Sequence, residues 1–365
     1  MATRLIALIA ILLALTQTAQ AQDADAFPRV GSFTFLADEK VSFDPDGSYL
    51  FNHTDGALVF EAQTAPEVRI VDNVSRQLER VLRPERPRVF AFSVFGTFMV
   101  RLRMFDTTSS PVRTPSYMPK GTVQLAWLKN LSSADRENSP VAFLEGPIEM
   151  WLVSAIPFGH HSNGQDGCLF TDQARVDDEC VPEEPSDPRP ETVNRKDGSF
   201  STNYIRVGVQ YRRLYPRGDD PVDVRAITRR EWGVGASLEL NPRGYLGGSI
   251  SDTLRPLYGP TRVGLSVDVV VGNWRPPILR RVTCGRAWAD LSLTFIRGAA
   301  PSVEDVVTSA EAACLPGGWG GAGLFVRYYR GQDYYNASFL ENINRLQFGV
   351  TFMHGKFLGF PAASN

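Results

Sequence analysis

Beyond its first residues, this 365-residue chain lacks any apolar run long enough for a membrane-spanning helix, which needs about 20 residues. The first 21 residues contain a shorter apolar run from Leu5 to Leu15 and end in the small-x-small pattern AQA. These features predict a secretory signal peptide over residues 1–21 and one domain over residues 22–365. If the exported domain enters a membrane, it must do so as a closed β-barrel, because irregular backbone is not tolerated in lipid.

The chain also has little net charge and few cysteines. A formal net charge of −2 gives no indication of a nucleic-acid partner. The four cysteines show no CxxC or HxxxH spacing, which makes a zinc site the weaker interpretation. Because exported proteins mature in an oxidising compartment, the spacing favours two disulfides, Cys168–Cys180 and Cys284–Cys314, although four cysteines allow three pairings.

The sequence does contain repeated alternation of apolar and polar residues. In VFAFSVFGTFMVRLRMF, residues 89–105, apolar side chains occupy alternate positions and Ser93, Thr97, Arg101 and Arg103 share the other face. The same period of two returns in at least five later segments, at residues 205–212, 231–240, 263–271, 286–295 and 345–352. Repeated strands of about 10 residues, apolar outside and polar inside, are typical of a transmembrane antiparallel β-barrel.

A soluble β-sandwich or lipocalin-like barrel alternates in the same way but turns its apolar face inward. The period alone does not separate these folds. The polar faces mix Arg, Glu, Asp and Gln with glycine, and Tyr or Trp flank several strands as interfacial girdles do. Both features favour an all-β membrane barrel.

The segment from about 165 to 198 interrupts the alternation. It is rich in Asp, Glu and Pro and contains two of the four cysteines. The segment lacks the D-x-[DN]-x-[DN]-G order of a calcium-binding loop, so we expect a solvated surface loop inserted in the barrel domain.

The stretch FGHHSNGQD, residues 158–166, gathers two of the four histidines beside a serine. On a strand His160 and Ser162 share one face and His161 points to the other. An imidazole so placed can accept the hydroxyl proton as the serine attacks a carbonyl, and a third group must orient the imidazole. Asn203 begins the next alternating strand, so antiparallel pairing would bring it beside His160. An uncharged amide is also less costly than a carboxylate next to lipid.

An HxS pair alone is a weak motif, and a polar turn through Ser162, Asn163 and Gly164 is the simpler alternative. The combination nevertheless resembles the outer-membrane phospholipase A family of bacteria, whose pattern is HxSNG followed by Asn at the start of the next strand. Upstream, SSPVRTPSYMP at 109–119 resembles a further family segment. Downstream, YYRGQDYYNASFLENINRLQFGVTF at 328–352 resembles the closing strands. The resemblance spans roughly residues 46–357.

The resemblance implies a twelve-stranded barrel in the bacterial outer membrane that hydrolyses phospholipid acyl esters, depends on calcium and is active as a homodimer. It implies that Ser162 is the nucleophile, His160 the base and Asn203 its orienting partner, with the Gly164 N–H facing the oxyanion. The implied calcium ligands are Ser199, the Gln165 carbonyl and Ser109 of the neighbouring subunit.

The chain departs from the family pattern in two places. About forty residues separate Ser162 from Asn203 where the family has a short loop, and PAASN follows the expected terminal Phe. Two other functions stay open: an inactive porin-like or ligand-binding outer-membrane barrel, and a soluble exported esterase.

Overall fold

The computed structural model describes residues 32–34, 39–43, 57–81, 86–106, 114–131, 147–177, 179–182, 194, 197–216, 228–247, 254–275, 283–299, 301, 303–316 and 322–352. The expected signal peptide and Ser109 lie outside these ranges. Within them, no helix is both long and apolar enough to cross a membrane.

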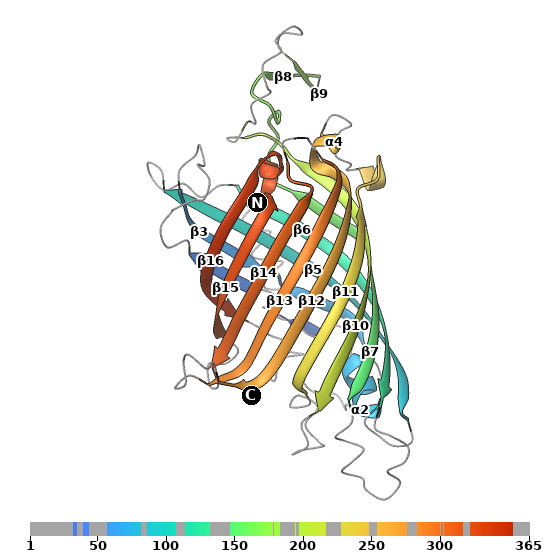
Figure 1. Ribbon diagram of the computed structural model, residues 1–365. Coiled ribbons are helices and arrows are strands. Elements are labelled where there is room, and N and C mark those ends of the chain that lie inside the picture. The colour runs from blue at the N-terminus through green and yellow to red at the C-terminus, as the bar shows by residue number, and fades with distance from the viewer. Residues whose placement is uncertain are drawn as a thin grey trace, which may run out of the picture.

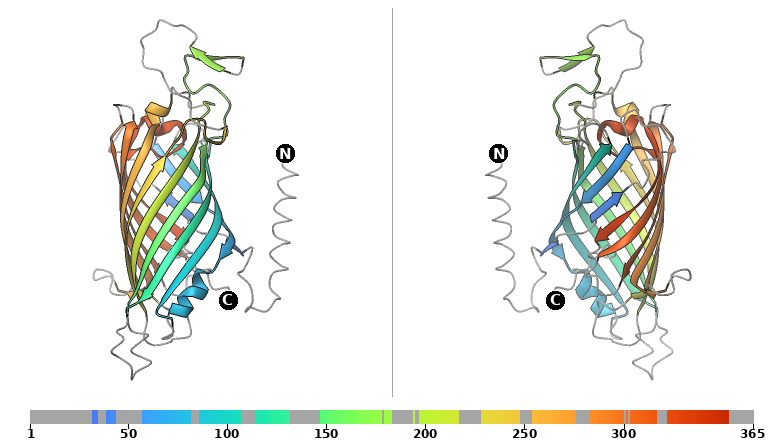
Figure 2. Two further views of the ribbon diagram at one scale, coloured as in Figure 1. Left: turned by 90° about the vertical axis from the view of Figure 1, so that its right-hand side faces the viewer. Right: turned by 90° about the vertical axis from the view of Figure 1, so that its left-hand side faces the viewer.

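Within the described ranges, one antiparallel sheet of 14 strands closes on itself to form the barrel in Figures 1 and 2. In chain order the strands are β1 (Ser32–Thr34), β2 (Glu39–Phe43), β3 (Ala57–Thr64), β4 (Glu67–Asp72), β5 (Arg88–Asp106), β6 (Ser116–Asn130), β7 (Ile148–Ser162), β10 (Ser201–Pro216), β11 (Thr228–Leu240), β12 (Gly259–Trp274), β13 (Cys284–Ala299), β14 (Val306–Pro316), β15 (Ala322–Gln332) and β16 (Asn342–Phe352). The pairing of β2 with both β3 and β16 completes the circle.

The described barrel wall has twelve strand positions, called staves below. Their number is smaller than 14 because two of the staves are each built from two strand segments. β3 and β4 both pair with β5, one after the other along its length. β1 and β2 pair in turn with β4 and β3. The expected number of strands is therefore confirmed.

The apolar faces of the staves point out of the barrel. Phe90, Val207 and Leu346 belong to the apolar faces of β5, β10 and β16, and they are 58%, 55% and 61% exposed. A soluble barrel would bury these side chains, whereas a membrane barrel places them against acyl chains. The exposed apolar faces thus identify a membrane barrel and exclude a soluble one.

The barrel interior is polar, and several of its charged side chains form ion pairs. Arg103 donates to Glu61 at 2.7 Å and to both oxygens of Asp333 at 2.7 and 2.9 Å, and Arg327 donates to Glu61 at 2.8 Å. On the other side of the barrel, Arg212 bonds Glu231 and Asp268. Buried charges persist when they are paired in this way. The glycines and charges of the predicted inner faces thus line a filled lumen.

An aromatic row crosses four neighbouring staves near one end of the barrel. Trp127 of β6 faces Trp151 of β7 in register, and the Trp151 ring lies 5.0 Å from that of Tyr211. The Tyr211 ring lies 5.5 Å from Trp232 of β11. Aromatic rings with one polar edge gather where acyl chains meet headgroups, so this row marks one membrane interface.

The same end of the barrel carries α2 (Val74–Val81) and is called the helix end below (Figure 2). Val74, Leu78 and Val81 recur at helical spacing and pack on Ala91, Leu128, Met150 and other inward residues. The carboxylate of Asp72 accepts the Val74 N–H at 2.9 Å and satisfies the start of the helix. An apolar layer therefore covers the lumen here, and the alternation of the sequence does not predict this helix.

We expect Leu78→Ala to destabilise the barrel by about 2 to 5 kcal/mol, because the side chain is fully buried between the helix and the barrel wall. Heat or urea unfolding in detergent micelles measures the effect. The matched control is Gln77→Ala on the partly exposed side of the helix, for which a change of only about 0.5 kcal/mol is expected.

The opposite end, called the hairpin end, carries β8 (Gln173–Val176) and β9 (Glu179–Pro182), together with η3 (Tyr245–Gly247), α4 (Arg255–Tyr258) and η4 (Asn336–Leu340). A second apolar cluster lies here, consisting of Leu169, Phe170, Phe200, Tyr258 and Phe339. Burial in this cluster raises the pKa of the Tyr258 hydroxyl above its usual value, so the group stays neutral at physiological pH.

Both predicted disulfides are present. Cys168 and Cys180 join the start of the inserted loop to β9. Cys284 and Cys314 join β13 to β14 near the ends of these strands. The cysteines are thus all paired within the described part of the chain.

Candidate active site on the lipid face

A β-bulge in β7 decides which way the candidate site faces. Up to Ile156 the even-numbered residues of β7, such as Met150 and Leu152, are buried inside the barrel. Pro157 and Phe158 then occupy the space opposite Ile205 alone, because Ile156 pairs with Arg206 and Gly159 with Tyr204. After this bulge the odd-numbered residues point inward. His160 and Ser162 consequently lie on the outer, lipid-facing side of the barrel.

His160 and Asn203 are register partners on β7 and β10, and their side chains meet. His160 Nδ1 lies 2.6 Å from Asn203 Oδ1, a hydrogen-bond distance. Ser162 lies two residues further along the same face and pairs with Ser201. The structure therefore brings the three predicted residues together. Among the described residues, no hydrogen bond links the Ser162 hydroxyl to the His160 ring.

A turn after β11 covers the Asn203 amide. Asn203 Nδ2 donates to the Tyr245 carbonyl oxygen at 2.8 Å, and the Tyr245 hydroxyl donates to the Pro157 carbonyl in the bulge. Asn203 is consequently only 3% exposed, although its face of the strand points away from the lumen. No local pattern predicts this contact, because 42 residues separate the two partners.

Tyr117 of β6 flanks the predicted nucleophile on its other side. It is the register partner of Ser162 and is 37% exposed. Its ring also lies against Gly164, where an added Cβ would come within 3.3 Å of the ring. Gly164 has a φ of +65°, which glycine adopts without strain. The Tyr117 ring thus packs on Gly164, two residues after the predicted nucleophile.

The inserted loop has two limbs, the segment that follows β7 and the segment that precedes β10. The Asn163 side chain joins them. Its Nδ2 donates to the Gly198 carbonyl at 2.6 Å, and its Oδ1 accepts from the Phe200 N–H at 2.9 Å and from the Gln165 N–H at 3.3 Å. A side chain that replaces backbone pairing in this way fixes both limbs. The sequence pattern around Asn163 predicts no more than a polar turn.

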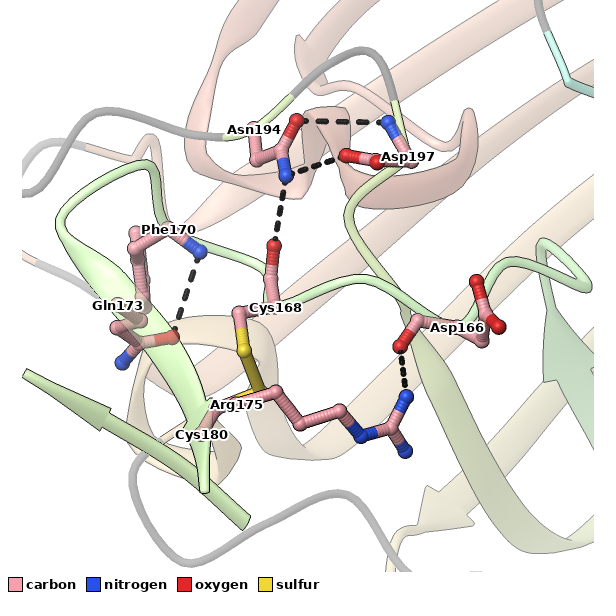
Figure 3. Close-up of a disulfide and its surroundings, with 8 residues drawn as sticks. All are labelled: Asp166, Cys168, Phe170, Gln173, Arg175, Cys180, Asn194 and Asp197. Atoms are coloured by element: carbon pink, nitrogen blue, oxygen red, sulfur yellow. Dashed lines mark hydrogen bonds between the residues drawn. A yellow bond between two sulfur atoms is a disulfide. The ribbon is translucent and has the colours of Figure 1, made fainter. Parts of the chain in front are cut away.

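The described part of the inserted loop continues this ordered base, as Figure 3 shows around the disulfide. Asn194 donates through Nδ2 to the Cys168 carbonyl at 3.0 Å and to Asp197 Oδ1 at 2.6 Å. Arg175 donates to the Asp166 carbonyl at 2.6 Å. β8 and β9 form a small hairpin that projects beyond the barrel. The base of the expected solvated loop is therefore held by a disulfide and by hydrogen bonds.

The predicted calcium ligands Gln165 and Ser199 lie on the two limbs that Asn163 joins. The Ser199 N–H donates to the Gly167 carbonyl at 2.7 Å, and the Gln165 side chain bonds the Thr114 hydroxyl. Hydroxyl and carbonyl oxygens are hard donors of the kind that calcium takes, so the chemistry of these residues fits the ion. Within the described ranges, no group of three or more His, Cys, Asp or Glu side chains could hold a metal ion. The third predicted ligand, Ser109, lies outside the described residues.

His161 points into the barrel, as its spacing predicts. It is 6% exposed and packs edge-on against Phe200, with ring centroids 5.0 Å apart. The imidazole therefore belongs to the apolar contacts of the hairpin end and not to the lipid-facing group.

Comparison with known proteins found no matching family model and no matching curated protein. Solved structures with a similar barrel include outer membrane phospholipase A from Escherichia coli, with a TM-score of 0.42 and 11% identity over 90% of this chain and 98% of that one. A calcium-bound dimer of the Salmonella typhi outer membrane phospholipase has a TM-score of 0.40 and 11% identity over 92% and 96%. A mutant of the Rh. blastica porin has a TM-score of 0.27 and 8% identity over 88% and 99%.

The exposed apolar face and the polar lumen of the chain's own structure make it a membrane β-barrel. Similarities this distant concern the fold alone, and the chemistry of the site depends on the residues of this chain.

Proposed function

We propose that this barrel is a phospholipase, which hydrolyses the acyl esters of membrane phospholipids with Ser162 as nucleophile. The observation that carries the proposal is the contact of 2.6 Å between His160 Nδ1 and Asn203 Oδ1 on the outer side of the barrel, with Ser162 on the same face. A barrel wall with a purely structural role does not require a hydrogen-bonded histidine and a serine side by side on its lipid-facing side.

Each of the three residues has a distinct task in the proposed reaction. Ser162 Oγ attacks the ester carbonyl carbon and passes its proton to His160 Nε2, while the amide of Asn203 holds the ring by its other nitrogen. The ring then returns the proton to the departing lysophospholipid oxygen. In the second half, a water attacks the acyl-serine, His160 again takes the proton, and the fatty acid leaves as Ser162 regains its hydrogen.

The negative charge that develops on the ester oxygen needs donors already in place. We assign this task to the Gly164 N–H, whose residue is turned by its left-handed conformation directly after Ser162 and Asn163. We expect the Ser162 hydroxyl to come within hydrogen-bond distance of His160 Nε2 only when substrate is bound, as is common for catalytic hydrogen bonds.

The surroundings of the site suit a lipid substrate. Phe158 and Val207 are exposed at 39% and 55%. They lie on the two strands that carry the proposed triad. Acyl chains that lie along such a surface would bring the ester to the rim of the barrel. We place this rim at the outer leaflet.

Calcium and a second subunit belong to the proposal as well. Gln165 and Ser199 would hold the ion through a carbonyl and a hydroxyl oxygen, and Ser109 of the partner subunit would complete the set. A bound calcium would supply positive charge next to the developing oxyanion. Because the ion would bind the dimer alone, it would also shift the equilibrium toward the dimer.

We expect the purified protein to release fatty acid from phospholipid in mixed micelles when calcium is present and to lose this activity with a chelator. Release should recover when calcium is restored. Sedimentation in detergent across the same titration should show dimers at active concentrations. Full activity in a chelator-treated monomer would contradict the calcium and dimer part and leave a calcium-independent lipase.

A porin-like or ligand-binding barrel is the second candidate. It is weakened by the apolar layers at both ends of the lumen and by the paired charges between them. Such a barrel would show no fatty-acid release under any of these conditions.

A further inference from the structure

The turn that follows β11 touches the proposed active site at two points. The Tyr245 carbonyl accepts from Asn203 Nδ2 at 2.8 Å, and the Tyr245 hydroxyl donates to the Pro157 carbonyl. Pro157 belongs to the bulge that turns His160 and Ser162 outward. One residue therefore bridges the strand of the histidine and the strand of the asparagine from outside the barrel.

The carbonyl contact fixes the orientation of the Asn203 amide. A carbonyl oxygen can only accept a hydrogen bond, so the NH₂ group of Asn203 must face Tyr245. The amide oxygen then faces His160, consistent with the distance of 2.6 Å between Oδ1 and Nδ1. An amide turned the other way would set two acceptors, its own oxygen and the Tyr245 carbonyl, against each other.

The amide orientation in turn fixes the protonation of the imidazole. Because Asn203 Oδ1 has no hydrogen to give, His160 Nδ1 must carry the proton of the neutral ring. Nε2 is then left with its lone pair, which is the form a general base needs. The opposite tautomer would present an N–H where the serine proton has to go.

The turn has a backbone shape that few sequences adopt without a reason. Gly244 and Leu246, on either side of Tyr245, have φ values of +64° and +53°. Leucine rarely occupies this left-handed region. Strained residues persist where surrounding contacts hold them, and such places are often functional. Here the two hydrogen bonds of Tyr245 hold the turn in this conformation.

We propose that Tyr245 is a positioning residue that sets the tautomer of His160 through Asn203. Its hydroxyl anchors the turn to the bulge, and its carbonyl, held in place by that anchor, selects the amide orientation. The consequence for catalysis rests on the proposed function, but the consequence for the tautomer does not.

The test is nitrogen-15 NMR of the histidine rings in the full-length protein in detergent micelles, which distinguishes the two neutral tautomers. The wild type should show His160 protonated at Nδ1. Tyr245→Phe keeps the ring and loses the anchor, so the signal should move toward a mixture of tautomers, and Tyr245→Ala should move it further. The matched control is Leu246→Ala in the same turn, which should match the wild type.

A kinetic measurement on the same variants separates positioning from binding. Tyr245→Phe should lower kcat for phospholipid about three- to tenfold, as expected for the loss of one hydrogen bond, with KM unchanged. Leu246→Ala should keep its kcat within about twofold.

The possible outcomes distinguish the two proposals. A wild-type His160 protonated at Nε2, or a Tyr245→Phe protein with an unchanged tautomer, would overturn the role of Tyr245 whether or not the protein is an enzyme. A changed tautomer in a protein that hydrolyses no phospholipid would uphold the positioning role and sink the proposed function instead. A fall in the kcat of Tyr245→Phe with no change in the His160 tautomer would also overturn the positioning role of Tyr245.

Discussion

Replacing Ser162 or His160 by alanine is expected to lower phospholipid hydrolysis at least about a thousandfold and to leave the barrel folded. The expectation follows from their proposed roles: one forms the covalent bond and the other moves the proton, so neither task can be shared. Both side chains lie on the outer face, where a smaller residue leaves the lumen contacts intact. Fatty-acid release and heat-dependent migration on gels measure activity and folding separately.

Two companion variants make this prediction specific. Asn203→Ala should lose less activity than Ser162→Ala, because the asparagine orients the base without touching the reacting atoms. His161→Ala should retain most of the activity, since its ring points into the barrel against Phe200. A His161→Ala protein as inactive as His160→Ala would show that the outward face has been assigned wrongly.

The second large effect is expected at Gly159, the residue before His160. A Cβ at this position would lie 2.3 Å from two atoms of the Tyr204 ring, which is itself buried. Gly159→Ala must therefore push β7 and β10 apart next to the site. We expect a loss of about 1 to 3 kcal/mol in the free energy of unfolding, the usual cost of overpacking. Hydrolysis should fall by at least about tenfold, because His160 and Asn203 sit on the two strands displaced.

The compensating change is Tyr204→Leu, which removes the ring atoms that the new methyl group meets. The double variant Gly159→Ala with Tyr204→Leu should recover stability and activity relative to Gly159→Ala alone. Heat unfolding and fatty-acid release on all three proteins complete the cycle. Additive losses in the double variant would contradict the proposed clash.

The barrel could be predicted because its signal is local. A period of two along residues 89–105 already assigns the two faces of β5, and the structure places Phe90 outside and Arg103 inside as that period requires. The meeting of His160 with Asn203 could also be predicted, because consecutive strands pair whatever loop joins them. The inserted loop at about residues 165–198 does not disturb this pairing.

Other parts of the site depend on contacts between distant residues and left no local signal. The bulge at Pro157 and Phe158 shifts the alternation by one residue, and only the break in the register with β10, opposite Ile205, reveals it. A proline inside a strand was the available hint, since proline is confined to edges and bulges. Tyr245 reaches Asn203 through a main-chain carbonyl, which any residue type possesses. α2 was missed because three apolar positions in eight residues predict little before the barrel wall is known.

The most direct test of the proposed chemistry is to incubate the purified protein with a lipid-like fluorophosphonate and to map the modified residue by mass spectrometry. Such a reagent is attacked by an activated serine that lipid can reach, and it leaves a stable covalent mark. We expect one adduct on Ser162, formed in the wild type and absent in His160→Ala, where the hydroxyl has no base. Labelling of another residue, or equal labelling of Ser162 with and without His160, would contradict a lipid-facing serine hydrolase on this barrel.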